Sequence, residues 1–440
     1  MVRNIIIEGN KVTKPYVIIR EIGINPGDSI PSAGVVQFLE RAKANIYNLK
    51  LFTNVNVNVK NWEEDGLDIH ISVTERWYII PVPIFQLADR NLNEWWVDRD
   101  RDFGRIQYGA TLNWTNFRGR NETLKVSASL GFAQLLDFNY YMPHLSKNGR
   151  IGGAFNVYMY QSKRMPYTTE RDKLQFYYDD NMIKRAVEIA PRVIIHRDIF
   201  INHYIEAKYS YRWIADKISE LNQDYFLNGE NKQTAIQLEY GFTIDKRNFR
   251  GYPTGGYMLK GSITNYGLGL QKQVNMTTAS IQASKFFTLD KIGNHSTGHM
   301  IKLKGSYPSK QPYNIQNGLG YNQDFVRGYE YYVIDGQNYA LFKNEYRYQV
   351  AALRLGADPK KAKPLLKQKI PIDIYFKAYL DGGYVQDKYF TRSNTLRNQW
   401  ILGGGVGVDI LLLFDRVIRI EYSLNKKMER GLFFHLELPM

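Results

Sequence analysis

The stretch Asp324–Glu330 carries the residues of this chain that are best suited to specific chemistry. Its single arginine, Arg327, follows Val326 and precedes Gly328 and Tyr329. A guanidinium can hold a carboxylate through charge-assisted, bidentate hydrogen bonds. Glycine lets the backbone turn tightly, and tyrosine can pack its ring against a neighbouring surface. One interpretation is an internal anchor held by acidic residues, and it depends on the architecture of the rest of the chain. The alternative is a solvated loop charge whose exposed ion pair contributes little.

The sequence contains no convincing catalytic constellation. Cysteine is absent, which excludes disulfides, thiol chemistry and thiolate metal sites. The seven histidines are scattered, and the nearest cluster is His295, Ser296 and His299, which suits a polar strand end. No paired-carboxylate site, glycine-rich phosphate loop or metal signature rises above background. We expect no enzyme activity, no catalytic residue, no metal ligand and no cofactor.

The composition favours a membrane surface over a nucleic acid as the partner. The chain has 440 residues, a formal net charge of +15, 33 tyrosines and 22 phenylalanines. This length fits one large domain and one small domain. Lysine and arginine are spread along the chain rather than gathered in one stripe, so we expect no nucleic-acid partner. Anionic lipid headgroups or lipopolysaccharide fit that spread.

Residues 1–76 predict a small α/β domain. Val2–Glu8 is a β-rich run, and Pro15–Ile22 suits a short helix closed by glycine. A second helix is predicted from Ser32, its expected N-cap. Its apolar stripe is Val35, Leu39, Ala42, Ile46 and Leu49. The period then changes to two, which predicts strands at Val55–Val59 and Leu67–Val73. The predicted order is β-α-α-β-β.

From Trp77 onward, apolar residues alternate with small polar or charged residues. The longest dense apolar run, Ile410–Phe414, is far shorter than the roughly 20 residues that a transmembrane helix needs. We count about 16 strands, whose polar faces carry Lys, Arg, Glu and Gln, as expected when one face meets lipid and the other a wet lumen. The predicted fold class is mostly β. Residues 77–440 form an antiparallel transmembrane β-barrel, about 16-stranded, after the small α/β domain.

Two connections in this region are longer than the others. Residues 164–184 are charged and rich in tyrosine, and we expect a loop there. Residues 311–336 contain Arg327. Long loops of transmembrane barrels lie on the extracellular side.

Several of these segments resemble a known superfamily. Val326–Tyr329 resembles the signature of the BamA/TamA/FhaC superfamily of outer-membrane assembly and secretion barrels. Residues 1–76, with Leu51–Val55 and a strand ending at Glu75, resemble a periplasmic POTRA domain. Lys343–Arg347 also matches the family pattern. The resemblance implies that the loop around residues 311–336 folds back into the lumen.

The same resemblance implies partners for Arg327. Tyr379–Gly383 is similar to the family's aspartate-bearing strand. Residue parity puts Asp381 and Glu345 on the faces that do not meet lipid. The resemblance therefore implies that Arg327 reaches Asp381, with Glu345 nearby. Asp245–Asn248 and the following Tyr252–Gly256 also resemble a recurrent hairpin of the family, which we interpret as a turn rich in Asn, Pro and Gly.

The resemblance also draws attention to the two end strands of the barrel. The first strand is expected within Tyr78–Leu87, where Pro81 and Pro83 remove ladder donors. The last strand is expected at 431–438, with Gly431 and Phe434. In BamA-like proteins, client strands enter at this lateral seam. The alternative is that the prolines only mark an edge near the junction with the POTRA-like domain.

The resemblance implies a non-enzymatic protein of the Gram-negative outer membrane, with the POTRA-like domain in the periplasm; an organellar outer membrane is less favoured. The expected function is assembly or insertion of outer-membrane proteins, and the alternatives are a polypeptide secretion pore and, less favoured, a passive channel. Expected partners are unfolded or nascent outer-membrane or secreted polypeptides, the lipid bilayer with its lipopolysaccharide, and accessory periplasmic proteins or lipoproteins. No signal peptide is visible at Met1–Arg3, so we expect that an export signal was removed or lies upstream.

Overall fold

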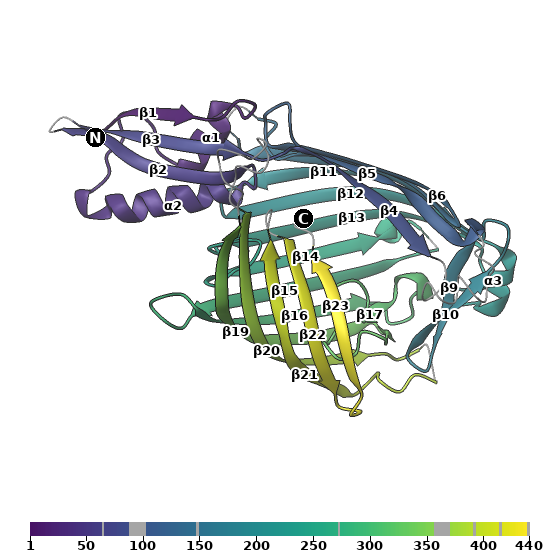
Figure 1. Ribbon diagram of the computed structural model, residues 1–440. Helices are drawn as coiled ribbons and strands as arrows, with labels where there is room; N and C mark the ends of the chain where they lie inside the picture. The colour runs from purple at the N-terminus through teal and green to yellow at the C-terminus, as the bar shows by residue number, and fades with distance from the viewer. Residues whose placement is uncertain are drawn as a thin grey trace. The chain divides into compact units, whose positions relative to one another are not determined.

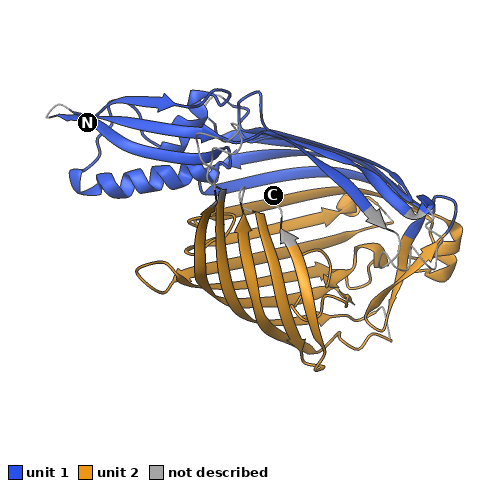
Figure 2. Cartoon of the chain, in the orientation of Figure 1, with its two compact units in different colours: residues 1–164, 179–212 blue, residues 165–178, 213–440 orange. Residues whose placement is uncertain are grey.

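The computed structural model describes residues 1–63, 66–87, 103–146, 149–271, 273–355, 370–389, 393–412 and 416–437. Phe414 and Leu438, which belong to the expected apolar run and last strand, lie outside these residues. The chain divides into two compact units (Figure 2). Unit 1 comprises Met1–Arg164 and Asp179–Arg212, and unit 2 comprises Met165–Tyr178 and Trp213–Met440.

The N-terminal part of unit 1 has the predicted element order (Figure 1). Its elements are β1 (Val2–Glu8), α1 (Pro15–Ile22), α2 (Val35–Asn48), β2 (Phe52–Glu63) and β3 (Gly66–Glu75). The sheet order is β1-β3-β2, with β1 parallel and β2 antiparallel to β3. Ser32 does not cap α2 as predicted, because it begins a 3₁₀ turn, Ser32–Gly34, and makes no side-chain cap bond.

This small domain has its own apolar core. Ala42 and Ile46 from the stripe of α2 are buried, as are Val17 and Ile18 of α1. They pack with buried strand residues such as Val55, Val57, Ile69 and Ile71. Each buried aliphatic side chain contributes about 1.5–3 kcal/mol relative to exposure. The two periodicities read from the sequence therefore meet in one core.

Sixteen of the remaining described strands form one sheet, in which the order along the sheet follows the order along the chain, and the other four form two separate two-stranded sheets. The strands of unit 1 are β4 (Ile79–Leu87), β5 (Ile106–Phe117), β6 (Glu122–Gly131), β7 (Ala133–Met142), β8 (Ile151–Ser162) and β11 (Lys184–His196), followed by β12 (Ile201–Ile214), which crosses into unit 2. Those of unit 2 are β13 (Lys232–Asp245), β14 (Gly256–Tyr266), β15 (Met276–Thr288), β16 (His295–Tyr307), β19 (Asn338–Leu355), β20 (Ile370–Gln386), β21 (Trp400–Leu412), β22 (Arg416–Asn425) and β23 (Arg430–Glu437). The predicted mostly β, antiparallel, 16-stranded fold class is confirmed.

The segment expected to be a loop at residues 164–184 is a hairpin instead. It consists of β9 (Arg164–Glu170) and β10 (Lys173–Tyr178). Arg171 and Asp172 between them both have positive φ, 52° and 60°, which suits a tight hairpin turn whose twist matches the strands. The charge and tyrosine content concealed this turn, because neither residue is the glycine or asparagine that usually marks it.

The sheet of unit 2 has one apolar and one charged face. On β20, Phe376 and Leu380 are exposed, whereas Lys377 and Asp381 between and beyond them are 3% and 1% exposed. Exposed apolar residues recur on β21 and β22. Because side chains alternate along a strand, one face is mainly apolar and the opposite face is polar, with exceptions such as Lys285 and His299 on the apolar face. No helix in the described part of the chain is long and apolar enough to cross a membrane.

Candidate functional site

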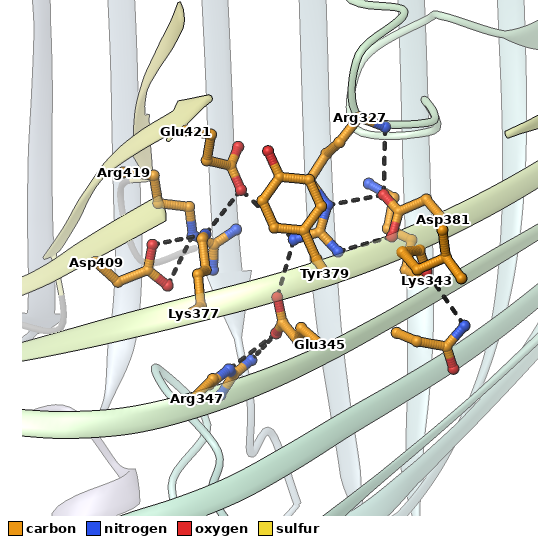
Figure 3. Close-up of polar contacts among 12 residues, drawn as sticks. Arg327, Lys343, Glu345, Arg347, Lys377, Tyr379, Asp381, Asp409, Arg419 and Glu421 are labelled. Atoms are coloured by element: carbon orange, nitrogen blue, oxygen red, sulfur yellow. Dashed lines mark hydrogen bonds and ion pairs between the residues drawn. The ribbon is translucent and has the colours of Figure 1, made fainter. Parts of the chain in front are cut away.

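Arg327 lies in the connection between β16 and β19, which contains a 3₁₀ turn, Tyr313–Ile315, and the short strands β17 (Asn317–Leu319) and β18 (Ile334–Asp335). Its side chain points to the charged face of β20, where it meets Asp381 (Figure 3). Nε and Nη2 of Arg327 donate to the two carboxylate oxygens of Asp381, each at 2.7 Å. The backbone amide of Arg327 donates to the same carboxylate at 3.2 Å. This bidentate geometry is the strongest form of an arginine–carboxylate contact.

Two further carboxylates face the same guanidinium. Nη1 of Arg327 donates to Glu345 Oε2 on β19 at 2.9 Å and lies 3.5 Å from Glu421 Oε1 on β22. The guanidinium carbon also lies 3.9 Å from the ring centre of Tyr379, a favourable cation–π distance. Arg327 is 5% exposed. The guanidinium is therefore enclosed by three acidic side chains and one aromatic ring.

Glycines on β21 make room for this arrangement. Gly403, Gly405 and Gly407 alternate along the strand, so they lie on the charged face. A Cβ at Gly403 would lie 1.9 Å from the carbonyl oxygen of Arg327, and one at Gly405 would lie 2.7 Å from Tyr379 Oη. We call the strip of β21 that these three glycines leave without side chains the glycine lane. The loop backbone and the Tyr379 ring lie against β21 in this lane.

The neighbours of Arg327 fix the loop backbone. Val326 is buried in an apolar cluster with Leu319, Ile334, Leu341, Val385 and Ile401, to which Tyr329 also belongs. Gly328 has a φ of 94°, a conformation that favours glycine. Its carbonyl accepts from Asn425 Nδ2 at 2.9 Å. The segment Val326–Tyr329 is therefore held by apolar packing as well as by charge.

The Arg327 partners are part of a larger set that we call the charged wall: Glu345, Arg347, Lys377, Asp381, Asp409 and Glu421 (Figure 3). Lys377 Nζ lies 2.6 Å from Asp409 and 2.8 Å from Glu421, and all three side chains are at most 2% exposed. Arg347 pairs with Glu345. Acidic and basic groups alternate across β19, β20, β21 and β22, so each buried charge has an opposite charge beside it.

The sequence placed Glu345 and Asp381 on this face but missed Lys377, Asp409 and Glu421 as members of one ion network. Two signals were available. Alternation within β22 puts Arg419 and Glu421 on one face, and the glycines of β21 recur with the same period of two. The order of the strands in the sheet is also needed to show that these charged residues contact one another.

The residues predicted at the lateral seam lie on β4 and β23, the two terminal strands of the 16-stranded sheet. β4 pairs with β5 along its whole length, and the carbonyl of Tyr78 accepts from the Thr115 amide at 2.8 Å. Antiparallel pairs alternate between bonded and non-bonded positions. Counting from Tyr78, the amide positions of Pro81 and Pro83 face away from β5. The prolines therefore leave the β4–β5 ladder intact and remove two donors from the other edge of β4.

The last strand, β23, pairs with β22 along its whole length, from Arg430 opposite Leu424 to Glu437 opposite Val417. Phe434 is 68% exposed on the apolar face. Gly431 lies beside the ring of Phe433, because a Cβ there would be 2.5 Å from that ring. Gly431 and Phe434 therefore lie on the terminal strand of the sheet order, as Pro81 and Pro83 do at its other end.

One cluster has atoms placed as metal ligands often are. A carboxylate oxygen of Glu330, one of Glu421 and an imidazole nitrogen of His435 lie within 4.8 Å of one another. Glu421 already faces Lys377 at 2.8 Å and Arg327 at 3.5 Å. A divalent cation at Glu421 would be repelled by these two protein cations. We therefore interpret the cluster as an extension of the ion network, and the absence of metal ligands stays a prediction.

Comparison with family models identifies the chain. Residues 1–76 match the surface antigen variable number repeat, a POTRA model, and residues 116–414 match the Omp85 superfamily domain. The chain belongs to the Omp85 superfamily. Members of this superfamily are outer-membrane β-barrel proteins that assemble or secrete polypeptides and are not in general enzymes. An assembly or secretion role in an outer membrane, with a POTRA domain, follows from this membership.

Solved structures agree with the Omp85 fold. The chain is similar to BamA from Haemophilus ducreyi lacking POTRA domains 1–3, with 12% identity, a TM-score of 0.55, and coverage of 99% of this chain and 83% of that chain. It is also similar to CdiB from Escherichia coli, with 13% identity, a TM-score of 0.56, and coverage of 99% and 75%. At these identities the likeness concerns the fold. Comparison with curated protein sequences gives no match.

Proposed function

We propose that this Omp85 protein inserts client β-barrel proteins into the outer membrane of a Gram-negative bacterium. Residues 1–76 are then a periplasmic POTRA domain, and residues 77–440 are a transmembrane barrel braced by the loop at 311–336. The observation that carries the proposal is the outward edge of β4. Pro81 and Pro83 both withhold donors there, which makes a ladder along this edge incomplete.

An incomplete ladder at a barrel seam has a mechanistic consequence. An unpaired backbone group in lipid costs several kcal/mol, so a barrel strand normally pairs along both edges. A seam that lacks two donors is easier to open than the other strand pairs. A client strand can then pair with the exposed edge of β4 or β23, and backbone pairing provides the driving force for its insertion.

The POTRA domain offers a second edge for clients. In the sheet order β1-β3-β2, the strand β2 lies at an edge. Asn54, Asn56 and Asn58 of β2 are exposed and alternate with apolar residues that face the core. An extended client segment can add to such an edge by β-augmentation. Accessory periplasmic proteins or lipoproteins would reach the client through the same domain.

A secretion pore is the second candidate. Its support is the Omp85 membership, which covers secretion as well as assembly, together with the similarity in fold to CdiB from Escherichia coli. A passive channel is less favoured, because diffusion of small solutes needs neither a POTRA domain nor the Arg327 brace.

Depletion of the protein distinguishes these candidates. Insertion predicts loss of many outer-membrane barrels from the membrane proteome, with secreted proteins reduced only as a consequence. Secretion predicts loss of one exported polypeptide with an unchanged outer-membrane proteome. An unchanged proteome and secretome would contradict both candidates. Deletion of residues 1–76 should abolish client handling while the barrel still folds.

The seam can be tested separately in a client-insertion assay with purified protein in lipid vesicles. Replacing Pro81 and Pro83 by valine restores two outward amides, which should tighten closure and slow insertion. Pro191→Val is the matched control, because Pro191 lies within β11 rather than on an end strand. Equal insertion rates for the wild type and the double variant would contradict a role of the β4 edge.

A further inference from the structure

The turn between β13 and β14 lies at the opposite end of the strands from the Arg327 loop. The chain leaves this turn at Gly256 and crosses the sheet with β14, β15 and β16 before it enters the loop after Tyr307. Three antiparallel crossings bring the chain to the other end. We interpreted this segment from the sequence only as a turn, yet Tyr252 within it is 4% exposed.

Tyr252 is buried because it contacts the charged wall. Its hydroxyl donates to Asp409 Oδ2 at 3.0 Å, and the guanidinium carbon of Arg347 lies 4.3 Å from its ring centre. Arg347 Nη1 also donates to the carbonyl of Pro253 at 2.8 Å. The ring lies 4.7 Å from that of Tyr375. Burial raises the pKa of Tyr252, so the phenol remains a hydrogen-bond donor.

Two chains of contacts lead from Tyr252 to Arg327. In the first, Arg347 Nε donates to Glu345 Oε1 at 2.9 Å, and Glu345 Oε2 accepts from Arg327 at 2.9 Å. In the second, Asp409 pairs with Lys377 at 2.6 Å, Lys377 pairs with Glu421 at 2.8 Å, and Glu421 lies 3.5 Å from Arg327. The two chains form a closed ring with Tyr252 at one end and Arg327 at the other.

We propose that Tyr252 is a positioning residue for Arg327, and that the β13–β14 turn thereby couples one end of the barrel to the loop at the other. Withdrawal of Tyr252 removes one hydrogen-bond donor from Asp409 and the aromatic ring from Arg347, while Asp409 keeps Lys377 and Arg347 keeps Glu345. A buried charge that loses one of its contacts must hydrate or move to replace it, and Lys377 and Glu345, which pair with Asp409 and Arg347, shift with them. Arg327 then loses two of its three carboxylate contacts in their present geometry.

Through this coupling, binding at the β13–β14 turn on the periplasmic side can change the position of the Arg327 loop. The inference rests on the proposed function in taking the turn end of the strands as the periplasmic end. A polypeptide segment that binds the Lys246–Gly255 turn and draws Tyr252 out would loosen the Arg327 loop. Binding of a client at the turn would then change the conformation of the loop at the other end of the barrel.

The test uses paired spin labels in the purified, full-length protein. The chain has no cysteine, so cysteines at Asn322 in the loop and at the exposed Leu353 of β19 carry the only labels. In the parent protein we expect one narrow distance distribution. Tyr252→Ala should broaden it, and Tyr252→Phe, which removes only the hydroxyl, should broaden it less. Tyr257→Ala is the matched control, because Tyr257 lies on β14 outside the ring of contacts and is 37% exposed.

A narrow, unchanged distribution in folded Tyr252→Ala protein would overturn the coupling. Folding is checked by the slower migration of heated samples on a denaturing gel. If Tyr252→Ala does not fold, Tyr252→Phe and Asp409→Asn remain as tests, and an unchanged distribution in both would overturn the proposal. The readout is independent of clients. Failure of the depletion experiment with a broadened distribution would reject the proposed function alone, and the reverse result would reject only the coupling.

Discussion

The polar faces of two groups of strands, β5 and β6 in unit 1 and β19 to β22 in unit 2, differ sharply in chemistry. On β5 and β6 the buried side chains of the polar face are neutral: Gln107 donates to Ser129 at 2.7 Å, and Thr111 donates to Ser127 at 2.9 Å. We call these four residues the neutral wall. The charged wall of β19 to β22 instead carries buried ions, such as Lys377 and Asp409 at 2.6 Å. Both walls obey the same alternation, so strand geometry alone does not explain the difference.

The difference lies in what each wall must hold. A small neutral pair contributes on the order of 1 kcal/mol and can be replaced at little cost. A buried ion that loses its partner costs about 3–5 kcal/mol, because the remaining charge is desolvated and uncompensated. The charged wall therefore fixes a single position of the Arg327 loop. The neutral wall contributes to strand pairing without specifying any loop.

The largest effect is expected for Arg327→Ala. The substitution leaves the buried Asp381 carboxylate without the two hydrogen bonds that Nε and Nη2 of Arg327 donate. It should destabilise the docked loop by about 3–5 kcal/mol. Protease cleavage between Gln311 and Gly336 should increase strongly while the barrel stays folded. Gln107→Ala in the neutral wall is the control and should leave cleavage unchanged. Equal protection of the loop in both variants would remove the distinction between the walls.

A second variant tests the glycine lane without changing any charge. Gly403→Ala would place a Cβ 1.9 Å from the carbonyl of Arg327, and the overlap should cost about 1–3 kcal/mol. Gly382→Ala is the control, because its nearest neighbour is a leucine methyl at 3.3 Å. We expect raised protease access to the loop only for Gly403→Ala. If the two variants behave alike, the lane does not position the loop.

A third prediction concerns pH and the part of the loop beyond Arg327. Burial, with the carboxylates of Asp387 and Asp172 nearby, raises the pKa of Asp335 to about 6, against opposing hydrogen bonds from Tyr321 and Thr169. Its contribution to loop docking is therefore present below its usual pKa of 3.8 and is lost as the pH rises through about 6. A shift of this size corresponds to roughly 1–3 kcal/mol.

The measurement is loop protection from protease as a function of pH. Wild-type protection should fall between about pH 4 and about pH 7. Asp335→Asn cannot ionise, so its protection should vary less over this interval and exceed that of the wild type at the upper end. Arg327 stays charged throughout, so its contact with Asp381 is not the cause. An identical pH profile in the two proteins would contradict the assignment to Asp335.

The smallest effect is expected for Ser127→Ala in the neutral wall. The hydroxyl of Ser127 accepts one hydrogen bond, from Thr111 at 2.9 Å. Its loss should lower the free energy of unfolding by about 0.5–1.5 kcal/mol without any change in loop protection. Chemical denaturation in detergent or lipid measures the first quantity. A loss of stability as large as that expected for Arg327→Ala would show that the two walls do not differ in their contribution.

Much of the fold was readable from the sequence because it depends on local periodicity. The stripe of α2 and the alternation in β5 and β6 each predicted an element that the structure contains. The errors occurred where turn chemistry was unusual. Arg171 and Asp172 form the β9–β10 turn without glycine, and Ser32 begins a 3₁₀ turn rather than capping α2.

The sequence by itself determined that Arg327 is followed by the glycine that its loop requires, and that Glu345 and Asp381 share a face with other charges. Parity along one strand is enough for both statements. Only the tertiary structure decided which charges meet. Lys377, Asp409 and Glu421 come from three strands, and Tyr252 enters from a turn far away in sequence. Their contacts depend on strand order, register and the empty glycine lane, which no single segment encodes.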